Sequence, residues 1–275
     1  KPFELKNTGV FFENYASASY LNFEYSKYLL HVHNYSSSRL QYLPTLYRPI
    51  VVGPFFTITP EIGMTSLLYG DSPKDGSQYL VQGRGGVELQ TQLFRYYRSF
   101  KHIIEPYAAY HYYSSPTTSP DQHYIFDLND GLTRLEYVSF GINNALYTKQ
   151  THYASSRILS ADIYTFAFFD TDKVVQAIPR IYGNFSYLPF QNLKYTLNTA
   201  WNIEHHQLDY FNFRTEWTLN EDFAISAEYR HRGSYWWRKV DRENFFLDMF
   251  HSEERLRYSP LSDRCDTVLF HIFYR

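Results

Sequence analysis

The sequence has little cysteine, no long apolar run and almost no net charge, and each of these deficits excludes a class of protein. Cys265 is the single cysteine, so no internal disulfide framework is available. No run of about 18 apolar residues occurs, and the mean hydropathy is -0.45, which together exclude a helical membrane protein. The net charge of -2 offers no electrostatic basis for binding nucleic acid.

Motifs of common enzyme classes are missing as well. The chain has no G-x-S-x-G elbow and no glycine loop that would cradle a phosphate, and residues 83–86 (GRGG) are expected to form a tight turn. Residues 1–4 lack the apolar segment of a signal peptide, so a mature form, a fragment or a protein that never crosses a membrane is expected. No catalytic residue, metal site or cofactor is predicted.

Aromatic residues, by contrast, are abundant. They make up 20% of the chain, with 28 Tyr and 23 Phe, which exceeds what a soluble core needs. Aromatic girdles mark both interfaces of membrane β-barrels, whose strands alternate in polarity. The composition therefore favours a barrel, with a large Tyr-rich soluble sandwich as the alternative.

Residues 191–232 show this alternation most clearly. Three successive segments carry apolar side chains at every second position, so each has one apolar and one polar face. Short links at 204–207 and 220–222 join them as an antiparallel meander. The apolar faces consist of Tyr195, Leu197, Thr199, Trp201 and Ile203, then Phe211, Phe213, Thr215, Trp217 and Leu219, then Phe223, Ile225, Ala227 and Tyr229.

Strand patterns extend over the rest of the chain. Pro44, Pro49, Pro54 and Pro60 are expected at turns, bulges or strand starts, because proline cannot donate to a ladder. Several segments reach the ~9–11 residues that span a bilayer. Further strands are predicted at 9–26, 29–33, 37–43, 51–59, 61–69, 87–93, 102–113, 135–147, 156–169, 178–188 and 264–275, and 236–256 is interpreted as a loop or a broken strand pair.

Together these patterns predict an all-β fold, an antiparallel transmembrane up-and-down β-barrel. With roughly 17–20 residues per strand and turn, the chain holds about 14–16 strands. Residues 1–275 are predicted to form a single barrel domain or a fragment of a larger barrel.

Several short motifs, in their order along the chain, resemble the LptD (OstA-like) family of lipopolysaccharide-assembly barrels. The similarity covers most of residues 40–275, and each motif on its own is short. The motifs are Leu43-Pro44 with the proline-spaced strands up to Tyr69; Glu105-Pro106, Tyr110, Tyr112, Pro116, Gln122 and Phe126-Asp127; residues 139–149 (SFGINNALYTK) followed by 159–170; and residues 263–275 with Cys265.

This resemblance implies a C-terminal barrel portion or a reduced member of the family, located in the bacterial outer membrane. The implied function is to translocate lipopolysaccharide and insert it into the outer leaflet without covalent chemistry, so no enzyme activity is expected. The implied partners are a lumenal lipoprotein plug of the LptE kind, periplasmic Lpt bridge proteins and membrane lipid. Cys265 is a candidate for a disulfide with a cysteine of a periplasmic domain, and a free thiol at the strand start is the alternative.

One basic and aromatic cluster is a candidate lipid-headgroup patch, because charge and ring stacking together grip phosphorylated lipid. Its alternative is an interface belt of snorkelling side chains. His31 and His33 share a strand face but lack a further metal ligand at a fixed offset, while His205 and His206 are expected in a turn. The patch comprises Arg230, Arg232, Trp236, Trp237, Arg238 and Lys239.

Three other functions stay open at this point. A barrel protease or lipase requires Ser, His and a carboxylate gathered at one rim, and such a set is assembled in space rather than in sequence. A general porin requires an empty, conducting lumen. A soluble sandwich requires the apolar faces of residues 191–232 to be sealed inside.

Overall fold

The computed structural model describes residues 2–24, 34–73, 76–119, 122–126, 130–149, 155–169, 177–233 and 265–274. None of these residues belongs to a helix with the length and apolar character needed to cross a membrane. Two compact units are distinguished: residues 1–89 with 109–137 (unit 1), and residues 90–108 with 138–275 (unit 2).

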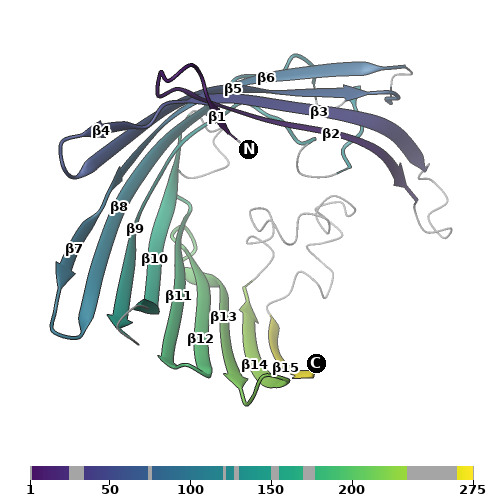
Figure 1. Ribbon diagram of the computed structural model, residues 1–275. Coiled ribbons are helices and arrows are strands. Elements are labelled where there is room, and N and C mark those ends of the chain that lie inside the picture. Colours follow the sequence, from purple (N-terminus) through teal and green to yellow (C-terminus); the bar gives the residue numbers. More distant parts are fainter. Residues whose placement is uncertain are drawn as a thin grey trace. The chain divides into compact units, whose positions relative to one another are not determined.

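The described residues form strands that pair antiparallel with their neighbours in sequence, as Figure 1 shows. Hydrogen bonding follows the order β1-β2-β3-β5-β6-β8-β9-β10-β11-β12-β13-β14-β15, with β4 on β5 and β7 on β8. This all-β, up-and-down sheet of 15 strands confirms the predicted fold class and strand number. The strands are β1 Phe3–Glu4, β2 Phe11–Phe23, β3 Tyr35–Tyr47, β4 Ile50–Val52, β5 Phe56–Tyr69, β6 Gln78–Thr91, β7 Leu93–Tyr96, β8 Phe100–Tyr113, β9 Leu135–Lys149, β10 Ser155–Phe169, β11 Arg180–Phe190, β12 Leu193–Asn202, β13 Gln207–Thr218, β14 Phe223–Arg232 and β15 Cys265–Tyr274.

In unit 1, β3 shows how the sequence alternation is used. Arg39 and Gln41 are 7% exposed, whereas the intervening Leu40 and Tyr42 are 51% and 40% exposed. Successive side chains of a strand point to opposite faces, so β3 has a covered polar face and an open apolar face. This is the reverse of a soluble protein, in which the apolar face packs into the core.

Two of the four prolines do not lie where the sequence predicted them. Pro44 lies within β3 and Pro60 within β5, at positions without a shift in the pairing register, rather than at turns, bulges or strand starts. The pairing of β3 with β5 passes from Tyr42 and Ser66 directly to Thr45 and Gly63, so Pro44 falls in a gap of that ladder. A strand thus continues through proline where its missing N–H faces a break in the pairing.

Other boundaries differ from the predictions too. Residues 83–86, expected as a tight turn, lie inside β6, where the backbone of Gly86 approaches the carbonyl oxygen of Tyr110 so closely that a Cβ would lie 2.9 Å from it. The strand predicted at 51–59 is two segments, β4 and the start of β5, that pair as a hairpin. The strand predicted at 29–33 and the interpretation of 236–256 lie outside the described residues.

In unit 2, the predicted three-stranded meander is confirmed as β12, β13 and β14. Leu197 pairs with Phe213, and Phe213 pairs with Tyr229. Cross-strand partners project from the same face of a sheet, so the predicted apolar faces form one continuous surface. The register continues onto β15, where Tyr229 lies opposite Val268 and Ile225 opposite Ile272.

The connections between the strands of unit 2 fall into two groups. In an antiparallel meander, successive connections lie at alternate ends of the strands. The links 191–192 and 219–222 lie at one end and the link 203–206 at the other, and at this second end β10 and β11 are separated by 10 residues in sequence and β14 and β15 by 32 residues. One end of these strands therefore has the shorter links, which we call the short-turn end of unit 2.

Candidate functional site: the polar face of the sheet

The apolar face of unit 2 is open. Trp201 is 41% exposed and Phe213 is 38% exposed, while Phe270 and Ile272 of β15 are 77% and 73% exposed. Ile225 is partly exposed. A soluble sandwich would cover these side chains with a second layer, so their exposure is evidence against that alternative.

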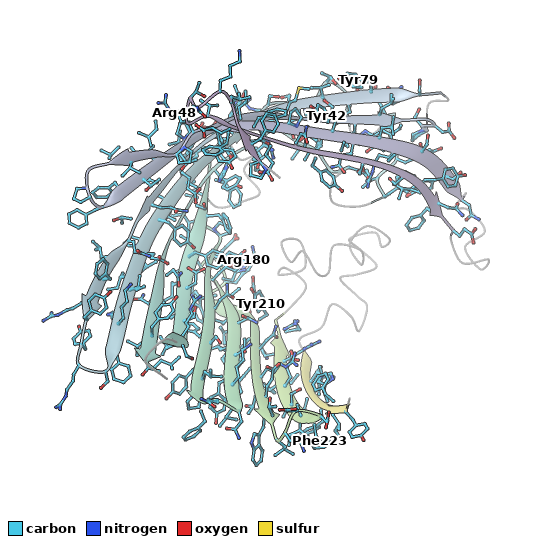
Figure 2. All side chains as sticks on the ribbon, viewed as in Figure 1. Tyr42, Arg48, Tyr79, Arg180, Tyr210 and Phe223 are labelled. Atoms are coloured by element: carbon cyan, nitrogen blue, oxygen red, sulfur yellow. The ribbon has the colours of Figure 1, made fainter. Side chains whose placement is uncertain are left out.

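The opposite face of unit 2 carries a row of polar side chains at matching register. Asp162 of β10 pairs with Asn184, which pairs with Asn198, which pairs with Asn212, which pairs with Arg230 of β14. Arg180 and Tyr210 extend from this same face (Figure 2). Five adjacent strands thus present hydrogen-bonding groups to one side, which we call the polar face.

The polar face also carries ion pairs, two within single strands and one between β12 and β13. Nε of Arg230 lies 2.5 Å from a carboxylate oxygen of Glu228, and a guanidinium nitrogen of Arg214 lies 2.7 Å from Glu216. Lys194 of β12 lies 4.0 Å from the same Glu216. The face therefore holds charges of both signs in contact with each other, an arrangement suited to a wetted surface.

A second polar cluster joins β10, β11, β12 and β13 at the end of unit 2 opposite the short-turn end. The fully buried carboxylate of Asp209 accepts hydrogen bonds from Nε of Arg180 and, at 3.3 Å, from the amide of Asn202. The carbonyl oxygen of Arg180 accepts a hydrogen bond from the hydroxyl of Thr165, at 2.5 Å. Because a buried carboxylate needs both a counter-charge and hydrogen-bond donors, this cluster ties four strands together.

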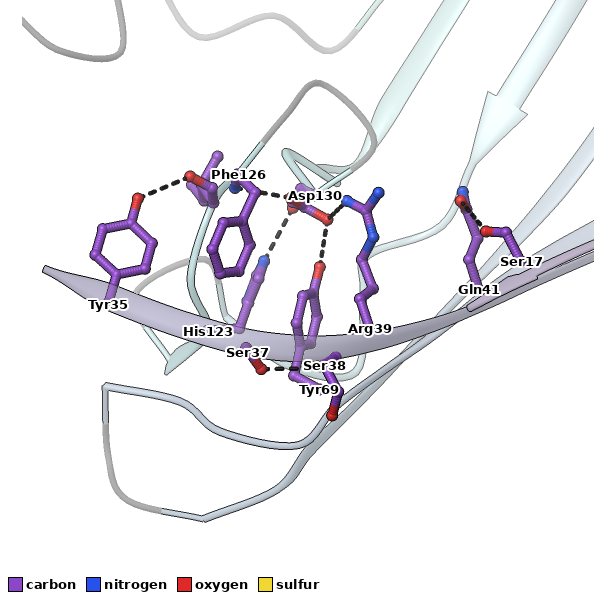
Figure 3. A network of polar contacts seen from close by, with 11 residues as sticks. Ser17, Tyr35, Ser37, Ser38, Arg39, Gln41, Tyr69, His123, Phe126 and Asp130 are labelled. Atoms are coloured by element: carbon purple, nitrogen blue, oxygen red, sulfur yellow. Dashed lines mark hydrogen bonds and ion pairs between the residues drawn. The ribbon is translucent and has the colours of Figure 1, made fainter. Parts of the chain in front are cut away.

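In unit 1, part of the connection between β8 and β9 lies against the polar face of β3, β5 and β6 (Figure 3). We call residues 114–119, 122–126 and 130–134 the β8–β9 loop. Asp130 of this loop is 0% exposed. Its Oδ1 accepts hydrogen bonds from Nη1 of Arg39 and from the hydroxyl of Tyr69, each at 2.6 Å, and its Oδ2 accepts the backbone N–H of Phe126 at 2.8 Å.

Further contacts fasten the same loop to the strands. The amide of Gln82 donates to the carbonyl oxygens of Ser114, at 2.9 Å, and Thr133, at 2.7 Å. The ring of Tyr35 stacks on Tyr124 with centroids 4.4 Å apart. Phe126 of the loop packs against Leu67 of β5 and Leu80 of β6 in a buried hydrophobic cluster. The loop is therefore a fixed cover over part of the polar face of unit 1.

This network could not be predicted from the sequence. Arg39 and Asp130 lie 91 positions apart, and nothing local to Asp130 distinguishes it from a carboxylate in an ordinary loop. The signal that could have identified part of it is the alternation on β3, which places Arg39 and Gln41 on one face and Leu40 and Tyr42 on the other. It did not show what would cover that face.

The residues predicted as a lipid-headgroup patch are only partly described. Arg230 forms an ion pair with Glu228, and Arg232 donates to Asn212 and lies over the ring of Tyr210, 5.8 Å from its centroid. Both arginines extend from the polar face, while Trp236, Trp237, Arg238 and Lys239 lie outside the described residues, as do His31 and His33. Cys265 begins β15 opposite Arg232, and His205 and His206 lie in a turn as predicted.

Several imidazoles lie near groups that orient a catalytic histidine in hydrolases. Nδ1 of His231 lies 2.7 Å from Asp266, and Nε2 of His102 lies 3.3 Å from the amide oxygen of Asn144. Within the part of the chain that the structure describes, no serine or threonine hydroxyl bonds to either ring, and no cluster of metal-binding side chains occurs. A triad needs all three groups in contact, so these pairs do not constitute one.

Comparison with known proteins adds likenesses of fold only. No family model and no curated protein matches the chain. Among solved structures, outer membrane phospholipase A from Escherichia coli matches with a TM-score of 0.36 and 6% identity over 95% of this chain and 89% of that one. The toluene transporter TodX of P. putida matches with a TM-score of 0.30 and 9% identity over 84% of this chain and 74% of that one. At these scores neither likeness decides the function of this chain.

Proposed function

We propose that this chain is the membrane-spanning sheet of a bacterial outer-membrane β-barrel protein. The observation that carries the proposal is the reversed burial along β3, where Arg39 and Gln41 are covered while Leu40 and Tyr42 are open. Lipid solvates an apolar face at no cost, and a polar face requires water or other polar groups. The apolar face therefore lies toward lipid and the polar face toward an aqueous interior.

The two described tryptophans support this orientation by their spacing. Trp201 lies opposite Leu208 near one end of β13, and Trp217 lies near the other end, nine residues further along that strand. At about 3.3 Å per residue this is roughly 30 Å along the strand, or roughly 23 Å across a bilayer for a strand tilted by about 40°. The apolar band of a membrane barrel is about 25 Å tall with aromatic girdles at both edges, so each tryptophan lies at one edge.

Quenching by brominated lipid tests this placement. With Trp236 and Trp237 replaced by Phe, the remaining emission of the protein in bilayers comes from Trp201 and Trp217. Bromine near the headgroup end of the acyl chain is expected to quench this emission several-fold more strongly than bromine at the chain terminus, because both rings lie at the edges of the apolar band. Equal emission in brominated and ordinary lipid would contradict the membrane-spanning role.

We further propose that the protein carries lipopolysaccharide to the outer leaflet by binding and passage, without covalent chemistry. The support is the ordered resemblance to the LptD family together with a polar face that holds paired charges. Residues 139–149 and the segment after 159, two of the resembling stretches, fall in β9 and β10. The proposed partners are a lumenal lipoprotein plug and periplasmic bridge proteins.

Lateral release of a lipid requires a weak seam between strands. In unit 1 the ladder between β3 and β5 lacks pairs at Leu43 and Pro44. Each missing backbone pair lowers the free energy needed to separate the two strands, because fewer hydrogen bonds have to be broken. This gap is a weakened stretch of the ladder, and it supports a route for lipid between strands.

Depletion of the protein in its native cell tests the lipopolysaccharide role. Newly made lipopolysaccharide is expected to accumulate inside the cell, and the surface level to fall several-fold, with increased permeability to large antibiotics. A strain that retains the protein at its normal level is the control. An unchanged surface level would reject the transport proposal while leaving the membrane-spanning sheet in place, and bulk ion conductance or lipid hydrolysis by purified protein would favour a porin or an enzyme.

A further inference from the structure

The hairpin formed by β7 and the start of β8 in unit 2 gathers cations and aromatic rings at its tip. Tyr96 pairs with Lys101, and the N–H of Tyr97 donates to the carbonyl oxygen of Phe100 at 2.7 Å, which closes the turn. Phe94, Tyr96 and Tyr97 are 57%, 67% and 52% exposed. Open rings of this size on a hairpin tip are unusual unless something other than water covers them.

The cations of this hairpin lie over the rings. Nζ of Lys101 lies 4.9 Å from the ring centroid of Phe94 and 5.5 Å from that of Tyr96, and the guanidinium carbon of Arg95 lies 5.4 Å from the centroid of Tyr97. Such cation–π contacts hold each cation beside a ring while its outward side stays available to an anion.

No carboxylate neutralises these cations. Within the described ranges, neither Arg95, Arg98 nor Lys101 forms an ion pair, whereas Arg180, Arg214 and Arg230 of the same unit each do. Three unpaired positive charges on one hairpin produce a local potential that attracts an anion.

A pocket of about 680 Å³ lies beside the hairpin tip. The hydroxyl of Thr148 in β9 donates to the carbonyl oxygen of Ser99 at 3.3 Å, so the pocket lies between the tip and the end of β9. Its wall includes Arg98, Lys101 and the side chains of Tyr96, Phe100 and Tyr147. A phosphate fits the charged part of this wall, and the glycerol or upper acyl part of a lipid fits the rings.

We propose that this hairpin binds the phosphate of an anionic phospholipid in the leaflet at the short-turn end of unit 2. The inference rests on the proposed membrane-spanning role. The turn of the hairpin precedes β8, so it lies at the same strand end as the links 191–192 and 219–222. Short turns mark the periplasmic end of outer-membrane barrels, and aromatic rings at strand ends lie at headgroup level, next to lipid phosphate. Binding anchors the hairpin to the inner leaflet.

Lipid exchange in nanodiscs tests the proposal with the full chain. The protein is reconstituted in phosphatidylcholine, titrated with phosphatidylglycerol, and the bound lipid is counted by native mass spectrometry. In the triple variant Arg95→Gln, Arg98→Gln and Lys101→Gln, the preference for phosphatidylglycerol over phosphatidylcholine is expected to fall at least tenfold. Each cation near a membrane surface contributes about a factor of five to the affinity for anionic lipid. The control Lys6→Gln with Arg48→Gln removes positive charge from unit 1 instead, and is expected to keep the preference.

Further measurements distinguish phospholipid from other sources of phosphate, and loss of the site from misfolding or failed membrane insertion. Arg95→Lys with Arg98→Lys keeps the charge and is expected to keep binding, which shows that a loss is not misfolding. Equal binding by the variant and the control overturns the site. Stronger competition by inorganic phosphate or by lipopolysaccharide than by phosphatidylglycerol also overturns the assignment to phospholipid. Failure of the protein to enter nanodiscs at all would instead reject the membrane-spanning role.

Discussion

Replacing Asp130 by Asn is expected to lower the free energy of unfolding by about 3–5 kcal/mol, because it removes one charge of a buried ion pair whose nitrogen and oxygen atoms lie 2.6 Å apart. The side chain of Arg39 is 8% exposed and that of Asp130 is 0% exposed, so solvent does not compensate for the lost charge. Urea titration of the protein in detergent micelles measures the change. The same substitution is expected to expose the β8–β9 loop to limited proteolysis, since Asp130 also accepts from Tyr69 and Phe126.

Two variants serve as controls for this result. Asp222→Asn changes an exposed turn carboxylate, and is expected to leave stability within about 0.5 kcal/mol of the parent. Combining Asp130→Asn with Arg39→Met removes both charges of the buried ion pair, and is expected to restore most of the stability that Asp130→Asn alone loses. If Asp130→Asn by itself unfolds at the urea concentration of the parent protein, the loop is not held by this ion pair.

Arginine placed on the two faces of unit 2 is expected to have opposite consequences. Phe213→Arg puts a cation on the apolar face near the middle of β13, and should make folding into bilayers less favourable by about 2–4 kcal/mol. Asn198→Arg puts the same side chain on the polar row of β12, where water and neighbouring polar groups solvate it, and should cost about 1 kcal/mol or less.

Reversible folding into lipid vesicles of known thickness measures both variants. The position of Phe213 between Leu197 and Tyr229 in the register makes it a central site of the apolar face, away from the girdle tryptophans. A larger penalty at Asn198 than at Phe213 would reverse the proposed orientation. Equal and small penalties at both positions would mean that neither face meets hydrocarbon.

The alternation of residues 191–232 was sufficient to predict the meander and its faces. The side-chain period of a strand is local, so a pattern such as Leu197, Thr199 and Trp201 identifies one face without knowledge of any partner. The predicted end of a strand at residue 43, the predicted start of another at residue 61 and the turn expected at residues 83–86 were wrong for the converse reason. Whether proline or glycine ends a strand depends on the neighbouring strand, which either leaves a gap at Pro44 or approaches closely at Gly86.

What the sequence determined by itself is the fold class, because an all-β chain with one apolar and one polar face per strand needs only the order of its residues. Only the tertiary structure decided which polar groups meet. Arg39 and Asp130 come together because the β8–β9 loop folds against β3 and β5, and Arg180 reaches Asp209 across β12. The cations of the β7–β8 hairpin stay unpaired because no carboxylate of the described chain is placed near them. Such contacts depend on distances between residues far apart in sequence, about which local periodicity carries no information.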